Sequence, residues 1–232
     1  MASFDIPRRR TTVEYRVTAV ESDPPRLRGM SHSLAFFAAL PLGFVLALEA
    51  STSIARVAAL LFGLSVAAMF GTSSLFHRIS WSPIAKNRMA VIDHAMIYGL
   101  IAGTYTPFAL LVLRETWGIP VLVLVCAGGA AAVTAKVIWR NPPPWVAVAT
   151  CLGLGWIALL VFPQIAAKIG AGGTTLLVAG GVAYTTGAVV YALRRPDPFP
   201  RTFGYHEIFH AFVVVAVACQ YAAVAFFVLP HA

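Results

Sequence analysis

The stretch His206-Glu207-Ile208-Phe209-His210 carries two imidazoles that could bind one metal ion. Residues four apart on an α-helix share one face about one turn apart, so both rings can reach the same ion. The stretch opens the last of several long apolar segments. Polar side chains are costly where water gives way to hydrocarbon, and their presence there indicates a functional site.

Three more polar residues lie near the ends of apolar segments: Ser73, His77 and Asp93. Three neutral histidines that leave one position open are the ligand set of a catalytic zinc site, which makes His77, His206 and His210 the candidate ligands. Zinc lowers the pKa of bound water toward about 7 and so provides a nucleophile at neutral pH. Asp93 could orient that water or take its proton, and Ser73 could hydrogen-bond the water or a developing oxyanion.

Each of these residues also has a structural explanation. A single histidine at a membrane interface, such as His206 or His210 alone, is more often satisfied by headgroups or a backbone carbonyl. Asp93 could cap a helix N-terminus, and Ser73 could bond back to a carbonyl of its own helix. His32, which opens the first apolar segment, is a possible outer-shell residue. The combination of these residues in one membrane leaflet favours metal binding.

The histidine pair also matches H-E-x-x-H, the zinc-protease signature in which the glutamate is the general base. Membrane proteases of this kind take a further acidic ligand from downstream in the sequence. No Asp or Glu follows Glu207 in this chain. A membrane metalloprotease is therefore the weaker of the two metal-dependent alternatives.

The composition is that of an integral membrane protein. Of its 232 residues, 59% are hydrophobic and 11% are charged, whereas a soluble domain has about 25% charged residues. Apolar runs of about 20 residues recur along the chain, as expected for transmembrane helices. We predict an all-α, polytopic membrane protein, a seven-transmembrane-helix bundle over residues 31–232, with spans at 32–50, 54–76, 90–112, 119–138, 145–163, 172–193 and 206–229.

The basic residues predict how this bundle is oriented. Fourteen of the 17 Lys and Arg residues lie on one side, in a basic flexible tail at residues 1–30 and in alternate loops, and the other side has only Arg56, Arg114 and Lys168. By the positive-inside rule the N-terminus is cytoplasmic and the C-terminus external. Because the charges cluster between apolar segments, nucleic-acid binding is not expected. All candidate site residues then lie within about two turns, roughly 10 Å, of a cytoplasmic helix end.

Rows of small residues predict where helices pack closely. Gly63, Ala67 and Gly71 form one such row in the second segment, and Ala183 with Gly187 forms another in the sixth. In membranes, small residues at this spacing let two helix backbones approach each other.

Three motifs together resemble the hemolysin III family, which belongs with the progestin and adiponectin receptors. They are Ser73-Ser74-Leu75-Phe76-His77, Asp93-His94 running on to Ile101-Ala102-Gly103-Thr104-Tyr105-Thr106-Pro107-Phe108, and His206-Glu207-Ile208-Phe209-His210. The likeness covers about residues 26–229. It implies seven helices with a cytoplasmic N-terminus and a zinc ion held by His77, His206 and His210. It also implies that Ser73 and Asp93 occupy the remaining polar positions, with Asp93 acting through water.

The resemblance further implies a function, because the wider superfamily includes alkaline ceramidases. We expect a zinc-dependent hydrolase of a lipid amide or ester, with a membrane lipid as substrate, in a bacterial plasma membrane. Bacterial members of the family are named for haemolytic activity, so a pore-forming cytolysin is an alternative. A pore needs a continuous polar stripe, whereas the polar groups here gather in one leaflet. A receptor or lipid-sensing regulator stabilised by zinc needs the same ligands and is a further alternative.

Overall fold

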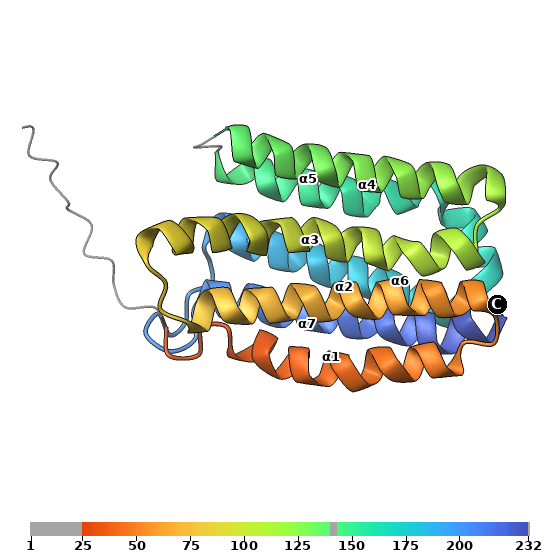
Figure 1. The fold of residues 1–232 in the computed structure, drawn as a ribbon, viewed down its shortest axis with the longest axis horizontal. Coiled ribbons are helices and arrows are strands. Elements are labelled where there is room, and N and C mark those ends of the chain that lie inside the picture. The colour runs from red at the N-terminus through yellow and green to blue at the C-terminus, as the bar shows by residue number, and fades with distance from the viewer. Residues whose placement is uncertain (1–24, 140–142, 232) are drawn as a thin grey trace, which may run out of the picture.

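The computed structural model describes residues 25–139 and 143–231, and its regular elements are helices (Figure 1). They are α1 (Met30–Glu49), α2 (Ser53–Arg78), α3 (Pro83–Leu111), α4 (Glu115–Ile138), α5 (Pro144–Trp156), α6 (Phe162–Leu193) and α7 (Tyr205–Ala223). Short 3₁₀ or π segments follow α5 and α7. No strand forms within the described residues, which confirms the predicted all-α fold.

Five helical stretches of the described chain are long and apolar enough to cross a membrane. They are Met30–Glu49, Ser53–Arg78, Glu115–Ile138, Trp145–Leu193 and Tyr205–His231. The stretch Trp145–Leu193 contains both α5 and α6, between which the chain reverses direction (Figure 1). Helix α3 is not among the five, and its first half carries Lys86, Arg88 and Asp93. The protein is therefore a multi-pass membrane protein.

Successive helices run in opposite directions along one long axis (Figure 1). The α2–α3 and α6–α7 connections lie at the end of the bundle where α1 begins, and the α1–α2, α3–α4 and α5–α6 connections lie at the opposite end. This alternation brings the C-terminal part of α2 and the N-terminal parts of α3 and α7 to the same end. The candidate site residues lie within these parts of the three helices.

The predicted rows of small residues are confirmed as helix contacts. A Cβ atom built on Gly63 of α2 would lie 2.9 Å from the Cα atom of Gly43 in α1. A Cβ atom on Gly187 of α6 would lie 2.9 Å from the Cβ atom of Phe212 in α7. Such distances are open only to glycine, so these rows allow α1 to pack on α2 and α6 on α7.

The boundary between the fifth and sixth predicted segments was wrong. Helix α5 ends at Trp156, a 3₁₀ turn follows at Ile157–Val161, and α6 already begins at Phe162, well before the predicted start at 172. Pro163 stands in the first turn of α6, where its fixed φ suits a helix start. Gly170 has φ 67° and interrupts the helical conformation inside α6. The residues 164–171 that we expected to form a loop are therefore helical with a kink.

The end of the predicted basic tail packs against another loop. Residues 1–24 of that tail lie outside the described residues, and residues 25–29 lead into α1. The backbone N–H groups of Arg26 and Leu27 donate to the carbonyls of Arg201 and Thr202, at 3.1 and 3.2 Å. These bonds hold the start of α1 beside the α6–α7 loop, next to the first turn of α7.

Candidate metal centre

His77, at the end of α2, lies together with His206 and His210 in the first turns of α7. One ring nitrogen from each residue lies within 4.8 Å of the other two. The ring centroids of His206 and His210 are 4.6 Å apart, and that of His77 is 4.8 and 5.0 Å from them. The structure thus brings together the three residues predicted as zinc ligands, although they come from distant parts of the chain.

This donor set fits a zinc ion. Tetrahedral zinc with Zn–N bonds of about 2.0–2.1 Å needs roughly 3.3 Å between ligand nitrogens, so modest ring rotations would bring nitrogens within 4.8 Å to that separation. The Nδ1 atom of His210 is buried and makes no hydrogen bond with the described residues. A buried polar atom without a partner is costly, and a cation among these rings would satisfy this histidine.

Ser73 lies one turn before His77 on α2 and is 3% exposed. Its hydroxyl oxygen is 2.9 Å from Nδ1 of His32 on α1, and it lines the same cavity as Asp93 of α3. Ser73 therefore bonds across to a neighbouring helix, and the alternative, a bond back to a carbonyl of its own helix, is not observed within the described residues.

His32, considered from the sequence as an outer-shell residue, packs directly on a candidate ligand. Its ring stacks on that of His210 with a centroid distance of 3.8 Å and an interplanar angle of 8°. The edge of Phe70 contacts His32 with a centroid distance of 5.0 Å. His32 is 2% exposed, so this residue of α1 is part of the buried surroundings of the site.

Asp93 lies well inside α3 and not at its start. The N-cap of α3 is Ser82, whose hydroxyl oxygen accepts a hydrogen bond from the Ala85 N–H at 3.4 Å. The alternative role of Asp93 as a helix cap was therefore wrong, because the helix begins at Pro83, before the predicted start at 90. Asp93 is half-buried and lines the same cavity as the three histidines.

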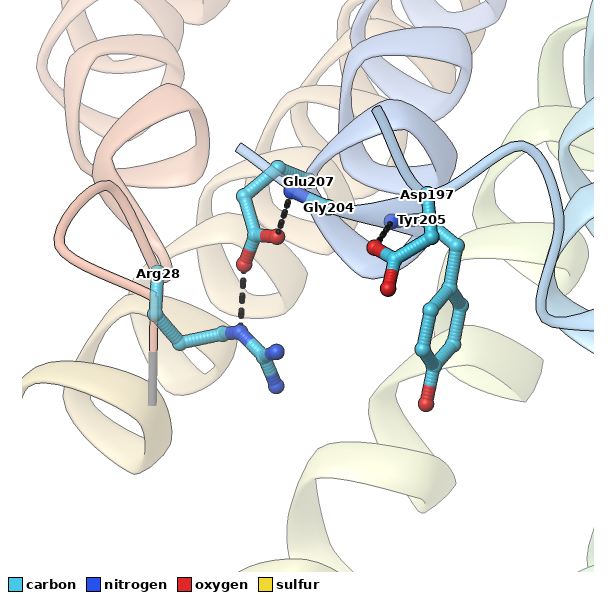
Figure 2. Close-up of polar contacts among 5 residues, drawn as sticks. All are labelled: Arg28, Asp197, Gly204, Tyr205 and Glu207. Carbon is cyan, nitrogen blue, oxygen red and sulfur yellow. Dashed lines mark hydrogen bonds and ion pairs between the residues drawn. The ribbon is translucent and has the colours of Figure 1, made fainter. Parts of the chain in front are cut away.

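Glu207, the glutamate of the H-E-x-x-H match, has both carboxylate oxygens engaged (Figure 2). Oε2 accepts a hydrogen bond from the Gly204 N–H at 2.8 Å, which closes a capping box at the start of α7, and Oε1 pairs with Nε of Arg28. The side chain is 2% exposed. A carboxylate held in this way is not available as a general base, which weighs against the protease alternative.

The residue before α1 makes a close approach to a candidate ligand that sequence analysis did not anticipate. Gly29 has φ 74°, and a Cβ atom there would lie 2.8 Å from the Cβ atom of His77. The Arg28–Glu207 pair adjoins this contact and was not anticipated either. Only the capping-box spacing of Gly204 and Glu207 could have suggested that this glutamate has a structural role.

A cavity of about 1450 Å³ extends from the three histidines into the bundle. It is bordered by residues of α2, α3, α5, α6 and α7, and basic side chains, including Arg78 and Lys136, line it near the site. Deeper in the bundle its walls are largely apolar, with Leu100, Ile101, Phe108, Leu152, Ile165 and Val213. A cavity with one polar end and long apolar walls suits an amphipathic molecule.

The chain matches the model of a family described as "Haemolysin-III related" over residues 22–221. It is 30% identical over 206 residues to "Hemolysin-3" of Bacillus cereus, and the aligned region covers 88% of this chain and 91% of that protein. It is 31% identical over 167 residues to a "Hemolysin-3 homolog" of Bacillus subtilis, with coverage of 72% and 75%. The human "Monocyte to macrophage differentiation factor" is 27% identical over 181 residues, with coverage of 73% and 69%.

Proposed function

Because the chain belongs to the hemolysin III family, we propose that it is a membrane zinc hydrolase that cleaves an amide or ester bond in a lipid. One observation carries the proposal: three histidine nitrogens lie within 4.8 Å of one another at the polar end of a cavity of about 1450 Å³. Three protein ligands and one open position are typical of catalytic zinc sites. The apolar walls of the cavity favour a lipid over a water-soluble substrate.

Each polar residue of the site has a role in this proposal. Zinc held by His77, His206 and His210 would polarise a carbonyl and activate water. A carboxylate oxygen of Asp93 accepts the proton that the attacking water loses and returns it to the leaving amine or alcohol. The Ser73 hydroxyl, which lines the same cavity as Asp93, hydrogen-bonds the attacking water or the developing oxyanion.

The proposal includes a topology. The chain crosses the plasma membrane of a bacterial cell seven times, with the N-terminus cytoplasmic and the C-terminus external. The alternating helix directions support successive membrane crossings (Figure 1). The basic residues on one side of the predicted spans support the orientation. The Bacillus relatives support a bacterial host. A phosphatase that is active only outside the cytoplasm, fused after Ala232, should be active, and an inactive but expressed fusion would contradict the topology.

The hydrolase is tested with purified full-length protein whose zinc content has been measured. Zinc-loaded protein should release fatty acid, detected by mass spectrometry, from at least one member of a panel of ceramides, N-acyl amides, lysophospholipids and phospholipids. Asp93→Asn should keep the zinc and slow this release by about 10²–10⁴-fold, as expected for loss of a general base. Protein with stoichiometric zinc that releases no fatty acid from the whole panel would contradict the proposal.

The names of the two Bacillus relatives favour a cytolysin as the second candidate. Its test is leakage of a dye from liposomes. Leakage that persists in the double variant His206→Ala/His210→Ala would favour the pore, because a hydrolase acting through these histidines would lose it. A regulator with a structural zinc predicts a third outcome: chelation lowers the melting temperature, but no lipid is turned over.

A further inference from the structure

We propose that His32 is a positioning residue of the candidate zinc site, with two separable contributions. Its ring holds the His210 imidazole in place by stacking, and its Nδ1–H group donates to the Ser73 hydroxyl oxygen and so directs the hydroxyl proton into the cavity. The inference rests on the proposed function, because it concerns how the metal ligands are oriented. It adds helix α1 to a site whose other polar residues come from α2, α3 and α7.

The stacking contribution follows from the packing around two buried rings. His32 and His210 are each 2% exposed, and their rings are nearly parallel, 8° apart in orientation with centroids 3.8 Å apart. Phe70 backs the His32 ring with its edge at 5.0 Å. Any large rotation of the His210 ring would therefore separate two stacked planes. Holding the ring in one orientation prepares its nitrogen for a metal.

The hydrogen-bond contribution follows from a buried contact between two helices. The Ser73 hydroxyl oxygen lies 2.9 Å from Nδ1 of His32, and the two residues are 3% and 2% exposed. If His32 carries its proton on Nδ1, the Ser73 oxygen accepts this bond and the Ser73 hydroxyl proton is left to point elsewhere. Ser73 and Asp93 line the same cavity, so that proton can then be directed into it. The bond therefore selects one tautomer of His32 and one direction of the Ser73 hydroxyl.

Helix α1 is held in register for this role by a neighbouring contact. The hydroxyl groups of Ser33 on α1 and Ser74 on α2 are 2.6 Å apart, one residue along from the His32–Ser73 pair on each helix. Ser33 also donates to the carbonyl of Gly29 at 3.0 Å. Removing the Ser33 hydroxyl therefore breaks an equivalent contact between the same helices without changing His32, which makes Ser33→Ala the matched control.

The stacking contribution is tested by zinc affinity, measured on the purified full-length protein by competition with a chromophoric chelator. His32→Ala should weaken zinc binding by about 10–100-fold, the usual cost of losing an outer-shell partner. His32→Phe keeps a flat ring, so its zinc affinity should lie within about threefold of wild type. His32→Asn keeps a donor near the Nδ1 position but has no ring, so it should bind zinc as weakly as the alanine variant. Ser33→Ala should bind zinc like wild type.

The hydrogen-bond contribution is tested in metal-free protein by thermal melting. His32→Phe should lower the melting temperature by a few degrees, because the buried Ser73 hydroxyl loses its donor. Adding Ser73→Ala to His32→Phe should cause no further loss, whereas Ser73→Ala combined with His32→Asn should. In cobalt-loaded protein, Ser73→Ala and His32→Phe should shift the visible absorption spectrum in the same way, and Ser33→Ala should not shift it.

Several outcomes would overturn the inference. Wild-type zinc affinity in His32→Ala, or the same loss in His32→Phe as in His32→Ala, would refute the stacking role. Strictly additive melting effects of His32→Phe and Ser73→Ala would refute the hydrogen bond. If His32→Ala does not fold, the comparison of the Phe and Asn variants decides the same question. A wild-type protein that binds no zinc would refute the proposed function, and the metal-free melting experiment would still test the His32–Ser73 bond.

Discussion

Replacing Glu207 by glutamine distinguishes a structural carboxylate from a catalytic one. Glu207 is 2% exposed and accepts from both Arg28 and the Gly204 N–H (Figure 2). Glutamine has only one carbonyl oxygen. If that oxygen accepts from the Gly204 N–H, the amide NH₂ group faces the Arg28 donor. If it faces Arg28 instead, an uncharged oxygen lies opposite the guanidinium and the NH₂ group faces the Gly204 N–H. Losing one partner of a buried ion pair costs about 3–5 kcal/mol. Because the Arg28 side chain is 21% exposed and can reach water, we expect about 2–3 kcal/mol.

This loss of stability is measurable as a shift in the melting temperature. For a chain of this size, about 2–4 °C per kcal/mol gives a decrease of roughly 4–12 °C. Arg28→Met should cost at least as much, since it leaves the carboxylate buried without its cation. The double variant Arg28→Met/Glu207→Gln should lose less than the sum of the two single variants, because the second change then removes no remaining ion pair.

Glu207→Gln should leave the zinc content unchanged and the turnover per folded molecule within about threefold of wild type. Loss of a general base would instead slow turnover by about 10²–10⁴-fold without requiring any loss of stability. Metal analysis, thermal melting and fatty-acid release are measured on the same preparation. A variant that melts like wild type but has lost turnover would refute the structural role and restore the protease-type mechanism.

Two further predictions concern the ligand set and the packing of α3. His77→Ala should lower the zinc content well below one ion per chain, because two histidines bind zinc poorly. The wild-type His94 ring bonds to the Ala90 carbonyl, so His94→Ala should retain the ion. Equal zinc contents of the two variants in a metal analysis would contradict the ligand assignment. Gly103→Ala should destabilise the protein by about 1–3 kcal/mol, because the new Cβ atom would lie 1.9 Å from Oγ and 2.4 Å from Cβ of Ser65. Gly99→Ala, with nothing within 4 Å of the new Cβ atom, should be neutral or stabilise the protein by up to about 1 kcal/mol, and similar melting temperatures for the two variants would refute this packing argument.

Much of the arrangement could be predicted because it depends on local periodicity. Helical spacing alone puts His206 and His210 on one face, and the positions of the apolar segments put Ser73, His77 and Asp93 at the same end of the bundle. Boundaries were less predictable where apolar residues continue across a break. Between Trp156 and Gly170 the chain turns and then kinks without any polar stretch to mark either feature.

The membrane character, the helical fold and the pairing of two imidazoles on one face can be predicted from the amino-acid sequence, since they depend on composition and on spacing within single segments. The contacts between side chains of different helices, His32 with Ser73 and His210, and Arg28 with Glu207, become visible only in the folded bundle. Such contacts depend on the rotation and depth of each helix relative to its neighbours. These are set by side-chain packing over the whole bundle and not by the spacing of residues within any one helix.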